Sequence, residues 1–264
     1  MRRNETKARL ARGERALGCF LRFPDPGLAE LLALQGLDFV VFDGEHGVLA
    51  PRECEQLARA VELHDVTPVV RVEENRAPSI LRYLDAGALG CHVPGVESRE
   101  DAVRAVRAVK FRPLGDRGLS ASRASGFGAA DGFPAYVAAA NDETLLVVHV
   151  ESVAGVAAVD EIAAVEGVDV LLVGTLDLSH DLGRPGELRH PDVVAAADRI
   201  AVAAAQAGKA LGAVVGRDPM DMQAWIERGA RYVLTTVESF VTPSVERFLA
   251  QARSGEPMRE ELGC

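Results

Sequence analysis

The chain has 264 residues, 48% of them hydrophobic and 5% aromatic, and a formal net charge of −10. This length and composition predict one large α/β domain or two small ones, with a sizeable buried core. The negative charge argues against a nucleic-acid or anionic-membrane partner, and no segment is apolar for long enough to cross a bilayer. The four cysteines lack metal-ligand spacing and the N-terminus lacks an apolar signal region, so we expect a cytoplasmic protein with reduced thiols.

Short apolar runs alternate along the chain with longer amphipathic stretches, a pattern typical of βα units. A surface helix is expected at 4–15. The first half then predicts strands at 16–20, 39–42, 68–72 and 90–96, and helices at 26–35, 51–63, 78–86 and 98–109. Residues 111–133 form a long loop rich in glycine and arginine, and such loops are usually functional or lie at an interface. The second half predicts strands at 145–150, 170–173, 210–215 and 232–237, and helices at 134–141, 152–165, 191–207, 219–228 and 243–253.

About eight βα units in one domain predict a (β/α)8 TIM barrel over residues 16–254, followed by a tail at 255–264. A doubly wound open sheet is the competing architecture. Polar residues follow or end several predicted strands, namely His46, Arg71, Glu151 and Asp177. In a closed barrel the C-terminal ends of all strands surround one mouth, whereas strands on both flanks of an open sheet could not all face one crevice. The distribution of polar residues therefore favours the barrel.

The residue types at these strand ends indicate a chemistry. Glu151 and Asp177 follow consecutive strands and could share Mg²⁺ or Mn²⁺, which prefer carboxylate oxygens and leave other positions to water and substrate. Arg71 suits a substrate carboxylate or a developing oxyanion, and His46 is a candidate proton carrier. Structural alternatives remain open: Asp177, expected in a loop, also suits the N-cap of the next helix, Arg71 a structural ion pair, and His46 a loop contact.

The three lysines constrain the mechanism further. Lys7 precedes the barrel units, Lys110 follows a helix, and Lys209 precedes a strand at the opposite rim. None of them is placed for a Schiff base with a carbonyl substrate. A barrel with this sequence that activates a carbonyl group would therefore use a metal.

Six motifs occur in a linked order: FDGEH (42–46), PVVRV (68–72), LDAGALGCHVPGVESREDA (84–102), RPLGDRG (112–118), HVES (149–152) and VEGVDVLLVGTLDLS (165–179). With these motifs the chain resembles the HpcH/HpaI class II aldolases, which are metal-dependent pyruvate aldolases, over about residues 17–249. The resemblance implies Mg²⁺, Mn²⁺ or Co²⁺ held by Glu151 and Asp177 and chelated by the keto and carboxylate oxygens of pyruvate. It also implies dimers that exchange the last helix and often assemble into hexamers, with the 111–133 loop near a subunit interface.

The resemblance also implies roles for the remaining site residues. Arg71 would stabilise the enolate, and His46 would assist proton transfer, polarised by Asp43 or by Asp85 of a neighbouring subunit. The substrate carboxylate would be bound by backbone amides around three consecutive residues, Gly174, Thr175 and Leu176.

Two departures from the family pattern concern the substrate. His149 stands where the family commonly has a glutamine that helps to orient pyruvate. That His149 is only a buried histidine with satisfied hydrogen bonds is an equal alternative. Thr175 and Leu176 stand where smaller or polar residues are usual, so the resemblance does not identify the acceptor substrate. The other four histidines, expected to be surface or packing residues, are His64, His92, His180 and His190.

The expected function is a carbon–carbon lyase that forms or cleaves 4-hydroxy-2-oxo acids from pyruvate and an aldehyde. A first alternative is an enolate condensation or lyase reaction on a keto acid or acyl thioester, citrate-synthase-like or malyl-CoA-lyase-like. A second alternative is a non-catalytic binding module on a barrel.

Overall fold

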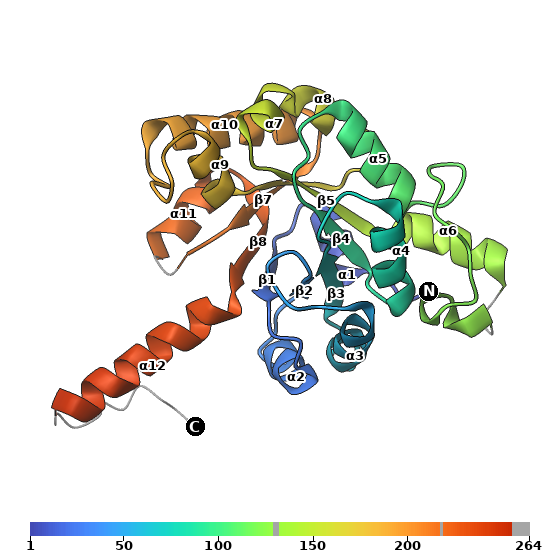
Figure 1. Ribbon diagram of the computed structural model, residues 1–264, viewed down its shortest axis with the longest axis horizontal. Coiled ribbons are helices and arrows are strands. Elements are labelled where there is room, and N and C mark those ends of the chain that lie inside the picture. The colour runs from blue at the N-terminus through green and yellow to red at the C-terminus, as the bar shows by residue number, and fades with distance from the viewer. Residues whose placement is uncertain (129–131, 217–218, 255–264) are drawn as a thin grey trace.

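The computed structural model describes residues 1–128, 132–216 and 219–254 (Figure 1). Eight parallel strands form a closed barrel in chain order, and β8 pairs with β1. The strands are β1 (Ala16–Leu21), β2 (Phe39–Asp43), β3 (Thr67–Arg71), β4 (Gly90–Val93), β5 (Leu145–Val150), β6 (Val170–Val173), β7 (Ala210–Val214) and β8 (Ala230–Thr236). The predicted TIM barrel is confirmed; the predicted tail at 255–264, with Cys264, lies outside the described residues.

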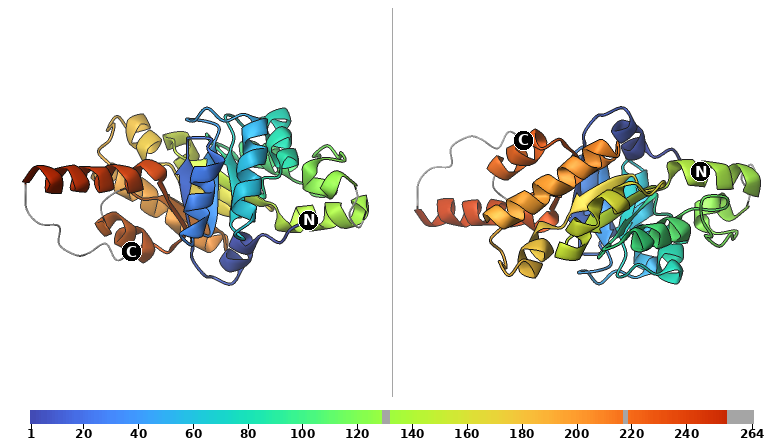
Figure 2. Two further views of the ribbon diagram at one scale, coloured as in Figure 1. Left: turned by 90° about the horizontal axis from the view of Figure 1, so that it is seen from below. Right: turned by 90° about the horizontal axis from the view of Figure 1, so that it is seen from above.

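Most of the helices surround the barrel on its outer side (Figures 1 and 2). In chain order the helices are α1 (Glu5–Ala11), α2 (Pro26–Leu34), α3 (Pro51–Glu62), α4 (Ala77–Ala86), α5 (Arg99–Val109), the 3₁₀ helix η1 (Arg123–Gly128), α6 (Phe133–Glu143), α7 (Val153–Ala157), α8 (Val159–Ala163), α9 (Thr175–Asp181), α10 (Pro191–Gln206), α11 (Pro219–Glu227) and α12 (Val237–Ser254). Ala158 divides the single helix expected at 152–165 into α7 and α8. The last helix begins at Val237 and not at 243, so Pro243 lies inside it.

The barrel interior is filled by side chains from alternate strand positions. Phe39 of β2 and Tyr232 of β8 stack there with ring centroids 4.1 Å apart. Gly18 of β1 gives this pair room, because a Cβ atom at residue 18 would lie 2.4 Å from the Phe39 ring. A second apolar layer, rich in Val, Leu and Ala, lies between the outer face of the strands and the helices.

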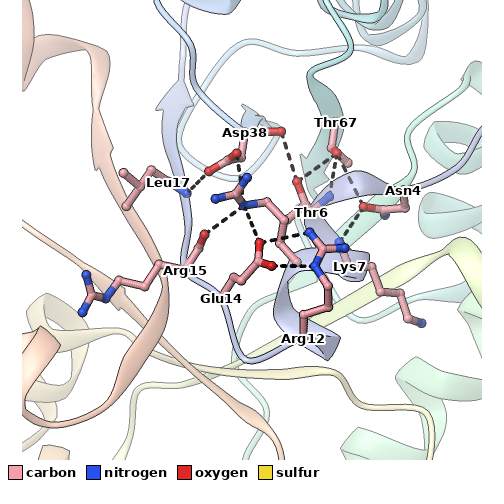
Figure 3. A network of polar contacts seen from close by, with 10 residues as sticks. Asn4, Thr6, Lys7, Arg12, Glu14, Arg15, Leu17, Asp38 and Thr67 are labelled. Atoms are coloured by element: carbon pink, nitrogen blue, oxygen red, sulfur yellow. Dashed lines mark hydrogen bonds and ion pairs between the residues drawn. The ribbon is translucent and has the colours of Figure 1, made fainter.

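The helix α1 and its N-cap residue Asn4 pack against the strand starts, and Figure 3 shows the polar contacts of Asn4 and Thr6 there. Asn4 and Thr6 are fully buried, and Leu10 belongs to the interior cluster. The Thr6 hydroxyl donates to the carbonyl of Asp38 and contacts the Thr67 hydroxyl at 2.9 Å. One face of the expected surface helix is therefore buried, because its polar side chains pair with groups at the strand starts, while Glu5 and Ala11 are exposed.

Two segments stand apart from the barrel wall. The helix α12 runs outward from the end of β8 (Figures 1 and 2), and apolar side chains along it, including Phe240, Val241 and Phe248, are half-exposed. The described part of the 111–133 loop folds back on its own chain, where buried Arg117 pairs with Asp85 at 2.9 Å. Across the described part of the chain, no helix combines the length and apolarity that a membrane span requires.

Candidate active site

The C-terminal ends of β2, β3, β5 and β6 bring most of the predicted polar residues to one mouth. Asp43 ends β2 and is in register with Arg71, which ends β3. Glu151 directly follows β5, and Gly174 directly follows β6. These placements follow from parallel strands ending on the same rim, as the sequence pattern predicted.

Arg71 is the best-anchored side chain of the mouth. Its Nε and Nη2 atoms donate to the two carboxylate oxygens of Asp43, at 2.9 and 2.6 Å. Its Nη1 lies 3.0 Å from Glu45 Oε2, and its guanidinium lies 4.4 Å from the centre of the Phe20 ring. The guanidinium plane is therefore fixed by two carboxylates and an aromatic ring.

The carboxyl group of Asp43 is completely buried. Burial alone would raise its pKa, but the hydrogen bonds and charge of Arg71 and the backbone N–H groups of His46 and Glu45 bring the pKa below its ordinary value. Asp43 Oδ1 accepts both of those N–H groups at 3.1 Å. One ionised carboxylate thus joins Arg71 to the turn that carries His46.

The His46 side chain is half-exposed at the mouth, 3.9 Å from Glu45. Among the described residues, Asp43 contacts the backbone of His46 and not its imidazole ring. Asp85 lies at the C-terminal end of α4, which runs back from the mouth, and pairs there with Arg117. The polarisation of His46 by Asp43, or by Asp85 of a neighbouring subunit, stays a prediction.

Glu151 lies at the mouth with its side chain 13% exposed. Its Oε1 accepts the N–H of Gly95 at 2.7 Å, and its Oε2 lies 3.4 Å from His149 Nδ1. Burial would raise the pKa of Glu151, but His149, Gly95 and Arg71 lower it to about 2. Gly174 packs against this carboxylate, since a Cβ atom at residue 174 would lie 2.3 Å from Oε2. Glu151 is therefore an ionised carboxylate in a fixed position, which suits it to serve as an oxygen ligand.

Asp177 lies in the first turn of α9, a helix absent from the predicted elements. The loop expected there is wrong, and so is the alternative that Asp177 caps the helix, because Gly174 is the N-cap. The Asp177 side chain is exposed. The helix forms directly after β6, and its N-cap residue Gly174 packs against Glu151.

The predicted amides of the substrate site differ among themselves. The N–H of Gly174 donates to the Val150 carbonyl at 3.3 Å and is occupied within the chain. Thr175 and Leu176 are the first two residues of α9, where N–H groups have no partner within the helix. Of the three predicted residues, Thr175 and Leu176 thus keep amides that α9 itself leaves free for a carboxylate.

The donor set fits a hard divalent cation. No group of three or more His, Cys, Asp or Glu side chains suited to a metal occurs in the described ranges of the chain. Glu151 is ionised at any ordinary pH, and Asp177 presents an exposed carboxylate. Two such carboxylates would suit an ion such as Mg²⁺, which takes its other ligands from water and substrate.

All three lysines lie at the other end of the barrel. The Nζ atoms of Lys7 and Lys110 donate to the carbonyl of Thr144, the residue before β5. Lys209 directly precedes β7. The mouth therefore holds no lysine for a Schiff base.

Sequence reasoning missed five residues at or beneath the mouth: Phe20, Glu45, His92, Gly95 and Tyr232. Glu45 was visible inside the FDGEH motif, between two predicted site residues. Burial raises the pKa of Glu45, and the nearby Glu151 charge adds to this, while Arg71 opposes it. His92 was expected to be a surface or packing residue; it is fully buried and contacts His149.

The chain resembles known proteins along most of its length. The model of the HpcH/HpaI aldolase/citrate lyase family matches residues 16–242. A hydroxypyruvate/pyruvate aldolase of Sagittula stellata is 36% identical over 96% of this chain and 98% of its own length. A 5-keto-4-deoxy-D-glucarate aldolase of Salmonella paratyphi C is 38% identical over 87% of this chain and 89% of its own.

Among solved structures, an HpcH/HpaI aldolase/citrate lyase family protein from Burkholderia cenocepacia superposes with a TM-score of 0.89 at 35% identity. The match covers 95% of this chain and 99% of that one. The chain therefore belongs to the HpcH/HpaI aldolase/citrate lyase family and is a carbon–carbon lyase of the aldolase type.

Proposed function

We propose that this protein is a metal-dependent aldolase that forms and cleaves 4-hydroxy-2-oxo acids through the enolate of pyruvate. The observation that carries the proposal is the fixed guanidinium of Arg71 beside ionised Glu151, at a barrel mouth without a lysine. The resemblance to a hydroxypyruvate/pyruvate aldolase supports pyruvate as the nucleophile.

In the cleavage direction the 4-hydroxyl group loses its proton, the C3–C4 bond breaks, and the bonding electrons pass to the carbonyl oxygen of the pyruvate half. The aldehyde leaves, and the enolate then takes a proton at its methylene carbon. Arg71 has five N–H donors, of which three contact Asp43 and Glu45. The other two can donate to the oxygen that becomes anionic, without moving the guanidinium.

His46 is the proposed proton carrier, because its ring is exposed at the mouth while its backbone is held by Asp43. The amides of Thr175 and Leu176 would receive the substrate carboxylate. A divalent ion held by Glu151 and Asp177 would supply the Lewis acidity that polarises the 2-oxo group.

A condensation of the same enolate with a keto acid or acyl thioester is the second candidate. It is favoured by one observation, namely that the matching family includes citrate lyases as well as aldolases. Both candidates need the same enolate, so a panel of aldehydes, keto acids and thioesters distinguishes them.

We further propose a homo-oligomer built from dimers that exchange α12, up to a hexamer. The projection of α12 away from its own barrel and the exposed apolar side chains along it support this assembly (Figure 2). A cytoplasmic location belongs to the same proposal, supported by three free cysteines in the described part of the chain, Cys19, Cys54 and Cys91.

The test is pyruvate release from a 4-hydroxy-2-oxo acid. EDTA should abolish the activity, and Mg²⁺, Mn²⁺ or Co²⁺ should restore it. Glu151→Gln should lose it, whereas Glu161→Gln, which changes an exposed carboxylate on α8, should not. Covalent trapping of pyruvate on a lysine by borohydride would contradict the metal-dependent mechanism.

A further inference from the structure

A row of polar side chains crosses the apolar barrel interior and ends at Glu151. The Tyr232 hydroxyl of β8 lies 2.8 Å from His92 Nε2 of β4. His92 Nδ1 lies 3.0 Å from His149 Nε2 of β5, and His149 Nδ1 lies 3.4 Å from Glu151 Oε2. Tyr232 and His92 are fully buried, and His149 is 2% exposed.

The order of donors in this row follows from its two ends. An ionised carboxylate only accepts hydrogen bonds. The ring nitrogen that faces Glu151, His149 Nδ1, is therefore expected to carry a proton. With its Nδ1 proton facing Glu151, His149 then accepts at Nε2 from His92 Nδ1–H. His92 in turn accepts at Nε2 from the hydroxyl proton of Tyr232. In this arrangement every buried proton has an acceptor.

The opposite order leaves a proton unpaired. If His149 Nε2–H donated to His92, then His92 Nε2–H would donate to the Tyr232 oxygen. The Tyr232 hydroxyl would then need another acceptor, yet His92 is its one hydrogen-bond partner in the described part of the chain. A buried donor without a partner is costly, so the first order is preferred.

Both remote groups stay uncharged in this interior. Burial lowers the pKa of His92 well below its ordinary value, and the neighbouring His149 and Arg71 add to that effect. Burial raises the pKa of Tyr232. The row therefore consists of a neutral phenol and a neutral imidazole behind His149, and Tyr232 supplies the donor at the end away from Glu151.

We propose that Tyr232 and His92 are positioning residues that hold His149 in the Nδ1–H tautomer and present this N–H to Glu151. His149 Nε2 is then occupied by His92, and His149 has no free lone pair with which to bind a metal. Gly95 and His149 hold the two oxygens of Glu151 from two sides. The part of this inference that concerns Glu151 as a metal ligand rests on the proposed function; the tautomers do not.

The first experiment is ¹⁵N NMR of the metal-free protein with ¹⁵N-labelled histidine, assigned with His149→Gln and His92→Asn. Two-bond ¹H–¹⁵N correlations distinguish a protonated ring nitrogen from an unprotonated one. We expect His92 and His149 both to carry their proton on Nδ1, whereas the Nε2–H form is the commoner one in free imidazoles. A proton on Nε2 of either ring would overturn the proposal.

Tyr232→Phe tests whether the hydroxyl sets the direction, because the stack on Phe39 is kept. Without that donor, His92 should shift toward a mixture of tautomers. Tyr136→Phe is the matched control, since Tyr136 is also buried and its hydroxyl contacts Arg117 and not a histidine. An unchanged His92 signal in Tyr232→Phe would show that the hydroxyl does not direct the row.

The second experiment measures Mn²⁺ affinity by calorimetry without substrate. Loss of a group that orients a metal ligand typically weakens binding about 10–100-fold, which we expect for His149→Leu. His149→Gln should bind within a few-fold of the parent, because its amide N–H can still donate to Glu151. Equal Mn²⁺ affinities of the His149→Leu and His149→Gln variants would show that His149 does not orient Glu151 for metal binding. Absence of Mn²⁺ binding in the parent protein would refute the proposed metal site. The tautomers observed by NMR would still decide the proposal about Tyr232 and His92.

Discussion

Replacing Arg71 by leucine should destabilise the fold through Asp43, and the structure gives the magnitude. Arg71 makes both short contacts to the fully buried Asp43 carboxylate, at 2.9 and 2.6 Å. Removing one partner of a buried ion pair costs about 3–5 kcal/mol, since the other charge stays buried and unpaired. Asp43 keeps two backbone N–H donors, so we expect about 3 kcal/mol, or about 6–12 °C in Tm for a chain of this size.

The assay is thermal and urea unfolding, with Arg22→Leu as the matched control. Arg22 lies 3.4 Å from the same carboxylate but is 40% exposed, so its loss should cost about 1 kcal/mol or less. Adding Asp43→Asn to Arg71→Leu should restore part of the stability, because the amide has no charge and its oxygen can still accept both N–H groups.

The loss of stability in Arg71→Leu should also depend on pH. The pKa of Asp43 is lowered in the folded protein, so its contribution is complete above the ordinary value of 3.8 and is lost as pH falls through the folded pKa. The Tm difference between the parent and Arg71→Leu should therefore narrow only in acid. Equal destabilisation by Arg71→Leu and Arg22→Leu, or no recovery with Asp43→Asn, would refute this reasoning.

Three further predictions concern the site and the assembly. Glu151→Gln and Asp177→Asn should each weaken metal binding by about tenfold or more in calorimetric titrations, since each removes a charged ligand from a sparse set; unchanged dissociation constants in both would move the site elsewhere. His46→Ala should lose about 10²–10⁴ in turnover and keep the inhibition constant of pyruvate, and near-normal turnover would make His46 structural. Light scattering at micromolar concentration should show an oligomer, and a lone species of 28.1 kDa would contradict the exchange of α12.

The barrel could be predicted from the sequence because each strand and helix is marked by a pattern within its own few residues. Apolar runs such as 145–150 and 170–173 match β5 and β6 in both bounds. Strand-end residues could also be assigned to one rim, because all parallel strands of a closed barrel end there. Arg71 and Glu151 were found in this way, whereas Asp43 came only from the resemblance to the family.

What could not be predicted depends on contacts between distant segments. Asn4 and Thr6 look like surface residues until their partners at the strand starts are known. His92 looks like any strand residue, since only closure of the barrel brings it to Tyr232, 140 positions away. The helix α9 has a polar, short sequence with no capping side chain, so no local pattern separates it from a loop.

The most direct test of the proposed chemistry is exchange of the methyl protons of pyruvate in D₂O, followed by ¹H NMR without any aldehyde. The proposal predicts exchange that requires Mg²⁺, Mn²⁺ or Co²⁺ and stops with EDTA. Arg71→Lys should slow it by about 10²–10³, because a lysine ammonium cannot reproduce the fixed guanidinium donors beside the enolate oxygen. Absence of exchange in the folded parent protein with all three metals would contradict the enolate mechanism.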